Sequence, residues 1–334
     1  MRGFLGVDVG SVSTNLVVID EYGSVISLIY RRTQGQPISA VQQGLKELQK
    51  DLTPDIKIAG VGTTGSARYL SGVIVGADIV KNEITAHAIA ASHVAPQVRT
   101  VLEIGGQDSK IILLRDGIVV DFAMNTVCAA GTGSFLDHQA ARLGIPIEEF
   151  GSYALNATVP CQIAGRCSVF AESDMIHKQQ MGYRMEDIIY GLCQALVRNY
   201  LNNLAKGKDL SSPIVFQGGV AANAGMKRAF EEALQMEIVI PEHYHVMGAI
   251  GAALLAKGTV RNGETRFKGF SVSSIDYRTR SFHCKGCENN CEIVKIQVDG
   301  KTLACWGGRC GKWEVQNPEE ADLLVQASTT SSVM

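Results

Sequence analysis

One β-hairpin pattern occurs twice in the chain, once at the start of each half. Residues 6–20 read as an apolar strand, a loop of Gly, Ser and Thr, and a second apolar strand that ends at a turn. Residues 102–114 repeat the same order. Repetition of a supersecondary unit is a strong constraint, because each copy must pack in a similar environment. The pattern predicts two related units, each opened by the same hairpin.

The loops of both hairpins have the composition of a phosphate-binding site. Glycine lets the backbone approach an anion, and backbone N–H and hydroxyl groups donate to phosphate oxygens. Carboxylates beside such loops can hold Mg²⁺ or orient an attacking water. The candidates are Asp8, Gly10, Ser11, Ser13, Gly105, Gly106, Gln107, Asp108, Ser109 and Lys110. Our alignment pairs Gly10 with Gly106 and Ser13 with Ser109. Two ordinary turns are the alternative, and the repetition argues against it.

A third candidate segment lies at residues 213–223. An apolar strand runs into Gly218 and Gly219, and a helix is expected from about residue 223 to residue 234. Paired glycines at a strand–helix junction suit the flat approach of an adenosine. We expect Gly218, Gly219 and Ala221 to line the adenosine pocket. The chain contains no G-x-x-x-x-G-K-[ST] sequence, and no well-placed G-x-G-x-x-G opens a dinucleotide fold.

Two cysteines stand at the start of expected helices. Cys128 precedes a helix expected at 133–143, and Cys167 precedes one expected at 168–178. A thiolate at a helix N-terminus gains from the unpaired N–H groups and the positive dipole end. Two such thiolates make half of a four-cysteine iron–sulfur site, which two copies of the chain would complete. Buried, inert cysteine is the alternative, and it is our interpretation of Cys161 and Cys193.

Composition narrows the function classes. The 334 residues, 46% of them hydrophobic, suffice for about two domains. A net charge of −2 without a long basic block argues against nucleic-acid and anionic-membrane partners. No membrane-spanning run and no signal peptide are recognised, so we expect a cytoplasmic protein. Nine cysteines then indicate metal or redox chemistry rather than disulfides.

The last part of the chain changes character after Gly258. A polar linker is expected at 261–265, and a β-hairpin with an Asp-Gly turn at 293–301. Two cysteine-bearing segments flank this hairpin, with Cys284, Cys287 and Cys291 before it and Cys305 and Cys310 after it. They suit structural Zn²⁺ or a second iron–sulfur cluster, and a small packing module is the alternative. Residues 326–334 are Ser/Thr-rich and are expected to be disordered.

Taken together, these motifs resemble the acetate kinase, sugar kinase, Hsp70 and actin superfamily. Within it, residues 1–260 are most similar to the activator (activase) ATPases of 2-hydroxyacyl-CoA dehydratases and benzoyl-CoA reductases, including the reductases of double-cubane-cluster proteins. The stretches that carry the resemblance are GGQDSK at 105–110, NTVCAAGTG at 125–133, GRCSVFAESD at 165–174 and QGGVA at 217–221.

The resemblance implies an α/β fold of the actin-like or Hsp70-like ATPase type. Two duplicated ribonuclease-H-like subdomains are expected, followed by a small cysteine-rich C-terminal β module. The implied boundaries are 1–98 with 246–260 for the first subdomain, 99–245 for the second subdomain with the cluster cysteines, and 261–334 for the tail.

The resemblance also implies a function. In this family a homodimer holds one [4Fe–4S] cluster through the cysteines matching Cys128 and Cys167, and each subunit binds ATP or ADP with Mg²⁺. The implied activity is an ATP-dependent one-electron reductase. Its donor is ferredoxin or flavodoxin, and its acceptor is an iron–sulfur dehydratase, a reductase or a double-cubane-cluster protein. ATP would act on the cluster potential or on docking geometry.

Residue roles follow from the same resemblance. Asp8, Gln107 and Asp108 are the expected catalytic residues, and the other loop residues bind the nucleotide. Glu83 begins an expected interdomain helix, where it either assists metal or water positioning or caps the helix. A small-molecule kinase of the same superfamily and a non-catalytic ATP-binding scaffold are the rival functions.

Overall fold

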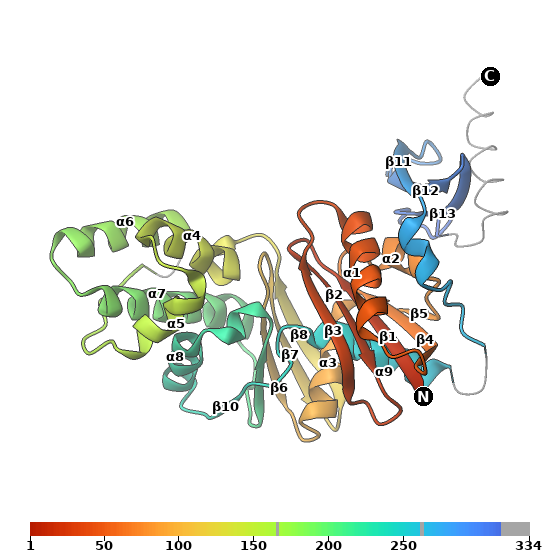
Figure 1. Cartoon of the computed structure of the whole chain (residues 1–334). Helices are drawn as coiled ribbons and strands as arrows, with labels where there is room; N and C mark the ends of the chain where they lie inside the picture. The colour runs from red at the N-terminus through yellow and green to blue at the C-terminus, as the bar shows by residue number, and fades with distance from the viewer. Residues whose placement is uncertain (165–166, 261–263, 315–334) are drawn as a thin grey trace.

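The computed structural model describes residues 1–164, 167–260 and 264–314. Two lobes lie side by side, each built on a five-stranded sheet, and a three-stranded sheet lies beyond the first lobe (Figure 1). The expected linker residues 261–263 and the Ser/Thr-rich end at 326–334 lie outside the described residues. Within the described part of the chain, no helix has the length and apolarity needed to cross a membrane.

The first lobe has the strand order β3-β2-β1-β4-β5. Strand β1 pairs antiparallel with β2 and parallel with β4, which places the first hairpin in the middle of the sheet. The elements of this lobe are β1 (Arg2–Val9), β2 (Ser13–Ile19), β3 (Val25–Arg32), α1 (Pro37–Asp51), β4 (Lys57–Thr64), α2 (Arg68–Val75), β5 (Ile79–Val80), α3 (Glu83–Val94) and α9 (Met247–Thr259).

The second lobe repeats this topology with the order β10-β9-β6-β7-β8. Strand β6 pairs antiparallel with β7 and parallel with β9, as β1 does with its neighbours. The elements are β6 (Thr100–Ile104), β7 (Ser109–Arg115), β8 (Ile118–Asn125), α4 (Gly133–Leu143), α5 (Ile147–Leu155), α6 (Ser168–Gln180), α7 (Met185–Tyr200), β9 (Ile214–Gln217), α8 (Ala224–Leu234) and β10 (Ile238–Val239), with short 3-10 turns η1 (Ala129–Gly131) and η3 (Gly219–Ala222) and a π-turn η2 (Leu201–Ala205).

The structural equivalence of the two hairpins differs by one residue from our sequence alignment. The last strand pair before the loop is Val9 with Thr14 in the first hairpin and Ile104 with Ser109 in the second. Each loop therefore has four residues. The amide of Gly10 donates to the carbonyl oxygen of Ser13 at 2.9 Å, and the amide of Gly105 donates to that of Asp108 at 3.0 Å. Gly105, not Gly106, is therefore equivalent to Gly10. Adjacent glycines made both alignments acceptable from sequence.

This shift reveals a pair of equivalent carboxylates. Asp8 occupies the position of Glu103, because both precede the last strand pair by one residue. Glu103 is buried and Asp8 is half-buried, at the same end of their sheets. The repeat therefore places one carboxylate in each lobe, facing the junction between them.

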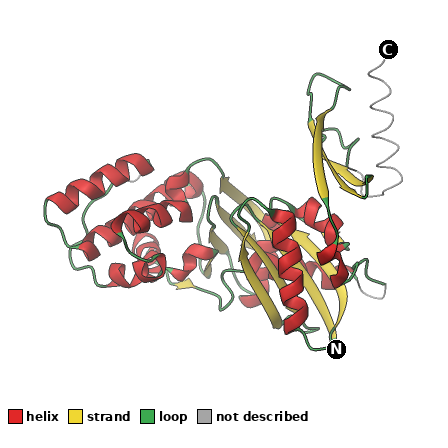
Figure 2. Cartoon of the chain, turned by 45° about the horizontal axis from the view of Figure 1, so that its top comes forward, coloured by secondary structure: helices red, strands yellow, loops and turns green. Residues whose placement is uncertain are grey.

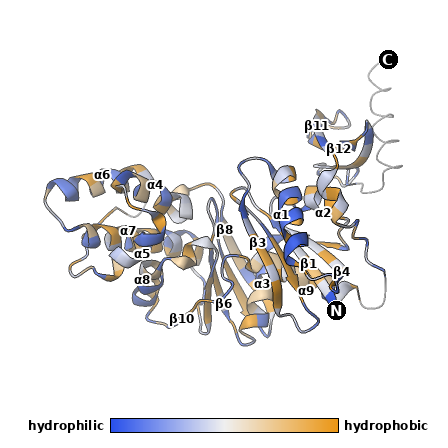
Figure 3. Ribbon diagram, viewed as in Figure 1, coloured by the Kyte–Doolittle hydropathy of each residue, from blue (hydrophilic) through white to orange (hydrophobic). Residues whose placement is uncertain are grey.

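Apolar strands form the interior of both sheets, as the orange colouring of the central strands shows (Figure 3). Helix α9 lies unusually close to the first sheet and to α3. A Cβ at Gly6 of β1 would lie 1.8 Å from the carbonyl oxygen of Ala249, and one at Gly251 would lie 1.9 Å from that of Ala86. Glycine at these positions allows helix and sheet backbones to touch. The close packing fixes α3, and with it one wall of the lobe junction.

The C-terminal module is an antiparallel sheet in the order β11-β12-β13 (Figure 2). Its strands are β11 (Arg278–His283), β12 (Glu292–Val298) and β13 (Lys301–Trp306), preceded by the 3-10 turn η4 (Phe270–Ser274). The expected Asp-Gly turn is confirmed, with φ of 49° at Asp299 and 80° at Gly300. Gln42 of α1 donates to the carbonyl oxygens of Val272 at 3.2 Å and Ile275 at 2.7 Å, which attaches the module to the first lobe.

We predict that Gly251→Ala destabilises the protein by about 2 to 3 kcal/mol, because the new methyl group must push α9 away from α3. Gly258→Ala is the matched control on the same helix. No atom lies within 4 Å of a Cβ there, so a stabilisation of up to about 1 kcal/mol is expected. Urea unfolding measures both values, and equal effects would contradict close packing at Gly251.

Candidate functional site

A cavity of about 390 Å³ lies between the lobes and is lined by both hairpin loops. Most of the residues expected to bind a nucleotide line it, namely Asp8, Gly10, Ser11, Ser13, Gly105, Gly106, Gln107, Asp108, Lys110, Gly218 and Gly219. Two expected residues do not line the cavity. Ser109 and Ala221 are buried behind the lining, where they support the loop and the η3 turn.

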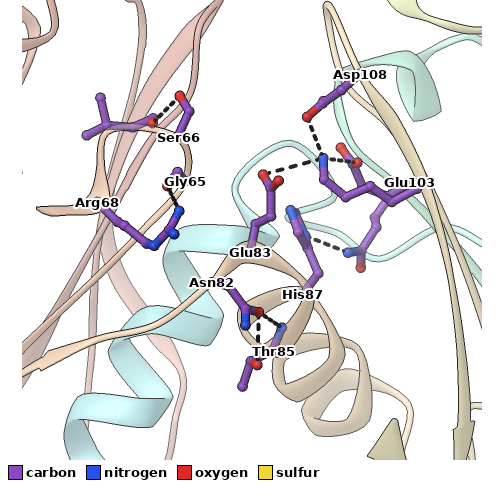
Figure 4. Close-up of polar contacts among 12 residues, drawn as sticks. Gly65, Ser66, Arg68, Asn82, Glu83, Thr85, His87, Glu103 and Asp108 are labelled. Carbon is purple, nitrogen blue, oxygen red and sulfur yellow. Dashed lines mark hydrogen bonds and ion pairs between the residues drawn. The ribbon is translucent and has the colours of Figure 1, made fainter. Parts of the chain in front are cut away.

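At the base of the cavity, three carboxylates surround one ammonium group. Lys110 Nζ lies 2.9 Å from Glu103, 3.0 Å from Asp108 and 3.5 Å from Glu83, and the lysine side chain is only 2% exposed (Figure 4). Burial alone would lower the pKa of Lys110, but the three carboxylates outweigh it and raise the pKa. The lysine is therefore a fixed positive charge within the site.

The equivalent carboxylates of the two lobes are both difficult to ionise. Burial raises the pKa of Asp8 to about 7, and the negative charge of Glu83 adds to the effect. Burial also raises the pKa of Glu103 to about 7, against the opposing charge of Lys110. Asp8 sits between two glycines, since a Cβ at Gly65 or Gly248 would lie 2.4 Å or 2.1 Å from its carboxylate oxygens. A bound cation would favour the ionised form of Asp8.

Helix α3 connects the two lobes through polar contacts at its N-terminal end. The cap of this helix is Asn82, whose side chain accepts from the amide of Thr85 at 2.9 Å. Glu83 instead points to Lys110 (Figure 4), so the capping alternative for Glu83 is wrong. His87 lies one turn after Glu83 in α3, and its Nδ1 accepts a hydrogen bond from the side chain of Gln217 of β9 at 2.8 Å. Burial lowers the pKa of His87 to about 3, so this imidazole is neutral.

Cys128 lies beside the phosphate-type loop of the second lobe. The side chain of Asn125 accepts from the Cys128 amide at 3.0 Å and donates to the Cys128 carbonyl oxygen at 2.8 Å. In the β7–β8 pairing, Asn125 faces Ser109, the residue directly after the loop. The backbone of Cys128 is thereby tied to the loop through one side chain.

The helix after Cys128 begins at Gly133, as expected, but it does not start at the cysteine itself. The 3-10 turn η1 lies between them, with Cys128 as its N-cap residue. The first two α4 amides, of Gly133 and Ser134, donate at 2.8 Å each to the carbonyl oxygens of Gly105 and Gly106. These N–H groups are consequently engaged with the loop and do not face Cys128. The expected helix-dipole contact at Cys128 is corrected to a direct loop–helix connection.

Cys167 is the N-cap residue of α6, as the sequence predicted for a cysteine that opens a helix. Helices α4 and α6 are linked through Glu172, which lies 3.0 Å from Arg142 and 3.4 Å from His138. Both cysteines are half-buried, and large apolar side chains beside them are exposed, with Val127 at 94% and Phe170 at 65%. An exposed apolar rim of this kind is typical of an interaction surface.

The tail cysteines are less organised than expected for a formed metal site. Across residues 1–164, 167–260 and 264–314, no three His, Cys, Asp or Glu side chains are gathered as a metal-binding group. Cys305 is buried with Ile293 and Trp313, and Cys284 and Cys291 pack against this apolar cluster. Both interpretations of the tail cysteines, a metal site and a packing module, therefore stay predictions.

Sequence reasoning missed three residues of the cavity region. Glu103, His87 and Gln217 supply a carboxylate, an imidazole and an amide at the lobe junction. The signal for Glu103 was available, because it is the single charged residue in an otherwise apolar strand at 100–104. His87 and Gln217 gave no such signal, since only the tertiary fold brings them together.

Two duplicated lobes that enclose a glycine-rich, carboxylate-bearing cleft define an ATPase of the actin-like superfamily. Residues 5–256 match the BadF/BadG/BcrA/BcrD ATPase family, and the chain belongs to this family. The match spans both lobes and stops before the C-terminal module.

Characterised relatives agree with this assignment. The 2-hydroxyisocaproyl-CoA dehydratase activator of Clostridioides difficile is 31% identical over 79% of this chain and 98% of its own length. The (R)-2-hydroxyglutaryl-CoA dehydratase activating ATPase of Acidaminococcus fermentans is 33% identical over 75% and 96%. A benzoyl-CoA reductase subunit from Thauera aromatica is 26% identical over 75% and 91%.

Solved structures of the first two proteins share the fold. The Clostridium difficile activator with bound ADPNP superposes with a TM-score of 0.71 over 77% of this chain and 95% of that chain, at 30% identity. Component A of the Acidaminococcus fermentans dehydratase gives 0.70 over 78% and 99%, at 31% identity. The expected family, the actin-like fold and an ATPase of the activator class are confirmed.

We predict that Asp8→Asn stabilises the nucleotide-free protein above neutral pH. The folded-state pKa of Asp8 lies above its ordinary value of 3.8, so the native state holds an extra proton between about pH 4 and pH 7. The free energy of unfolding therefore falls as pH rises through that window. The variant should gain on the order of 1 to 3 kcal/mol at pH 8 and almost nothing at pH 4.

Thermal unfolding of both proteins at pH 4 and pH 8 measures this difference. Asp121→Asn is the control, because the pKa of that exposed carboxyl is lowered by its hydrogen bond to Lys208. This control should show no gain at pH 8. Equal stabilities of wild type and Asp8→Asn at pH 8 would contradict a proton-binding Asp8.

Proposed function

We propose that the chain is an ATP-dependent activator that passes low-potential electrons to a partner iron–sulfur enzyme. Two copies would hold one [4Fe–4S] cluster through Cys128 and Cys167 of each copy. The observation that carries the proposal is the pair of hydrogen bonds from the α4 amides to Gly105 and Gly106, which join the nucleotide loop to the segment that bears Cys128.

The cysteines present fit such a cluster. Cys128 and Cys167 are half-buried, whereas the other two cysteines of the lobe, Cys161 and Cys193, are buried in its core. The second lobe of one copy thus offers two accessible thiols, and an iron–sulfur cluster takes four. A second copy would supply the other pair. When bound, the cluster supplies a one-electron carrier of low potential.

The cavity between the lobes suits Mg-ATP. Gly218 and Gly219 form a flat wall for adenosine, and the loops at 10–13 and 105–108 offer backbone amides to the phosphates. Asp8, Gln107 and Asp108 would hold Mg²⁺ or orient the attacking water. Lys110 contributes a permanent positive charge near the phosphates, because its three carboxylates keep it protonated.

Movement of the loop at 105–108 would reach Cys128 by two short routes. The first runs through the carbonyl oxygens of Gly105 and Gly106 to the start of α4. The second runs from Ser109 to its strand partner Asn125, whose side chain holds both polar groups of the Cys128 backbone. ATP binding and hydrolysis at the loop would therefore displace the thiol-bearing segment.

The same segments reach α6 and its cysteine. Glu172 of α6 pairs with His138 and Arg142 of α4, so a shift of α4 is passed to the helix that Cys167 caps. In a dimer, each copy would move its own pair of thiols relative to the other pair. This arrangement couples nucleotide state to the surroundings of the cluster.

The names of the relatives indicate the class of partner. Two of the relatives described above are an activator and an activating ATPase of 2-hydroxyacyl-CoA dehydratases, and the third belongs to a benzoyl-CoA reductase. We assign this chain a dehydratase, a reductase or a double-cubane-cluster protein as acceptor, and ferredoxin or flavodoxin as donor. A reducing cytoplasm suits this chemistry.

The proposed function also assigns the two parts of the chain that would move relative to each other. Residues 1–98 with 246–260 would move as the first subdomain, and residues 99–245 as the second. Family membership favours activation over phosphorylation of a small molecule as the purpose of ATP hydrolysis.

We predict that Glu83→Gln lowers ATP turnover about tenfold, a barrier increase of about 1.4 kcal/mol. Glu83 is the carboxylate that the first lobe contributes to Lys110, so its neutral analogue weakens the contact that the lobes make on closure. Nucleotide affinity should change much less than turnover. Glu21→Gln, an exposed carboxylate of the same lobe, is the control. Wild-type turnover in Glu83→Gln would remove this contact from the mechanism.

We predict that Cys167→Ala loses its iron and acid-labile sulfide on anaerobic purification and still binds Mg-ATP, because the thiol and the cavity belong to different surfaces. Cys193→Ala, which changes a buried core thiol, should retain the iron. Iron and sulfide analysis, EPR of the reduced protein and calorimetry with Mg-ATP measure these properties. Full iron content in Cys167→Ala would exclude it as a ligand.

A further inference from the structure

The C-terminal module brings four cysteines to one end of its sheet. The pair His283–Glu292 is the last between β11 and β12, and the pair Val294–Trp306 is the last between β12 and β13 at the same end. The loop at 284–291 and the segment at 307–311 therefore leave the sheet side by side. Tyr277, Ile296 and Ala304 join the core of the first lobe.

The two cysteine-bearing segments are in backbone contact. The amide of Cys284 donates to the carbonyl oxygen of Cys291 at 2.8 Å, which closes the first loop. Gly307 has a φ of 109°, and a Cβ there would lie 2.5 Å from the carbonyl oxygen of Glu292. The segment that leads to Cys310 thus starts directly against the residue that follows Cys291.

Cys305 differs from the other four cysteines of the module. It lies within β13, is 1% exposed and packs in the apolar cluster with Ile293 and Trp313. The remaining four are in the loops, and two of them, Cys287 and Cys310, are exposed. If Cys305 is left out of the five candidate metal ligands, the four loop thiols remain, which is the number that a tetrahedral site needs.

The first loop has the local geometry of a metal-binding turn. Cys284 and Cys287 are separated by two residues, the usual spacing within a zinc-binding pair. The amide of Gly286 donates to Cys284 Sγ at 3.4 Å. Backbone amides directed at sulfur orient a thiolate and stabilise its negative charge.

The distal end of the module has little else to hold it together. Its buried cluster consists of Ile293, Cys305 and Trp313, with Phe282, Cys284 and Cys291 packed around it. Modules of this size usually need a metal ion or disulfides in addition to their apolar core. Tyr277, Ile296 and Ala304 pack into the core of the first lobe, whereas the distal end of the module has only its own small cluster.

We propose that Cys284, Cys287, Cys291 and Cys310 bind one Zn²⁺ ion as a tetrahedral tetrathiolate site. A single ion with Zn–S bonds of about 2.3 Å suits two short loops at one sheet end. The four thiols are not gathered as a ligand set among the described residues, so binding would draw the segment of Cys310 onto the first loop. Metal binding would then fold this end of the module.

The test separates this site from the cluster of the proposed function. The full-length Cys128→Ala/Cys167→Ala double variant serves as background, since it cannot hold iron through those thiols. Elemental analysis should find about one zinc ion per chain in this background. Adding Cys287→Ser or Cys310→Ser should abolish zinc, whereas adding Cys305→Ala should retain it. Zinc that is absent from the background, or kept in both serine variants, overturns the proposal.

A second readout needs no substitution in the module. Replacement of zinc by Co²⁺ should give the d–d and thiolate charge-transfer bands of a tetrahedral tetrathiolate site. A chelator should expose residues 284–314 to limited proteolysis while the ATPase lobes stay intact. Iron with acid-labile sulfide in the double variant, or octahedral Co²⁺ spectra, would overturn the assignment of a zinc site.

Discussion

The arrangement of the lobes depends on one buried positive charge. Lys110 is held by Glu103 and Asp108 of its own lobe and by Glu83 of α3. An unpaired ammonium at this depth would cost several kcal/mol, so the lysine requires its carboxylates. Because Glu83 belongs to the first lobe, the full set forms only when the lobes adopt this relative position. The positive charge that lines the cavity thus also makes a contact that depends on the relative position of the lobes.

The connection from this site to the thiols is short and mostly backbone. Gly105 and Gly106 line the cavity, and their carbonyl oxygens accept from the first turn of α4. A two-sided loop of this kind cannot move toward a phosphate without moving α4. Asn125 adds a parallel connection to Cys128. The proposed activator role needs such a connection, since neither Cys128 nor Cys167 lines the cavity.

The sequence predicted what local patterns encode, and it failed where only tertiary contacts decide. The sequence located the helices at 133–143 and 168–178, the second of which ends at residue 180 in the structure, and the repeat revealed the duplicated lobes. The alignment of the repeat was wrong by one residue, because adjacent glycines at 105 and 106 leave the register undetermined. That error hid Glu103, the equivalent of Asp8. His87 and Gln217 are 130 residues apart, and no local pattern indicates their contact.

The decisive experiment for the shared electron carrier is native mass spectrometry of protein purified without oxygen, in the presence of Mg²⁺ and a non-hydrolysable ATP analogue. Because the second lobe of each chain offers two accessible thiols and each chain has one cavity between its lobes, we expect a dimer that carries four iron, four sulfide and two nucleotides. A monomer that binds nucleotide without iron, or a monomer with a complete cluster of its own, would contradict the proposed function.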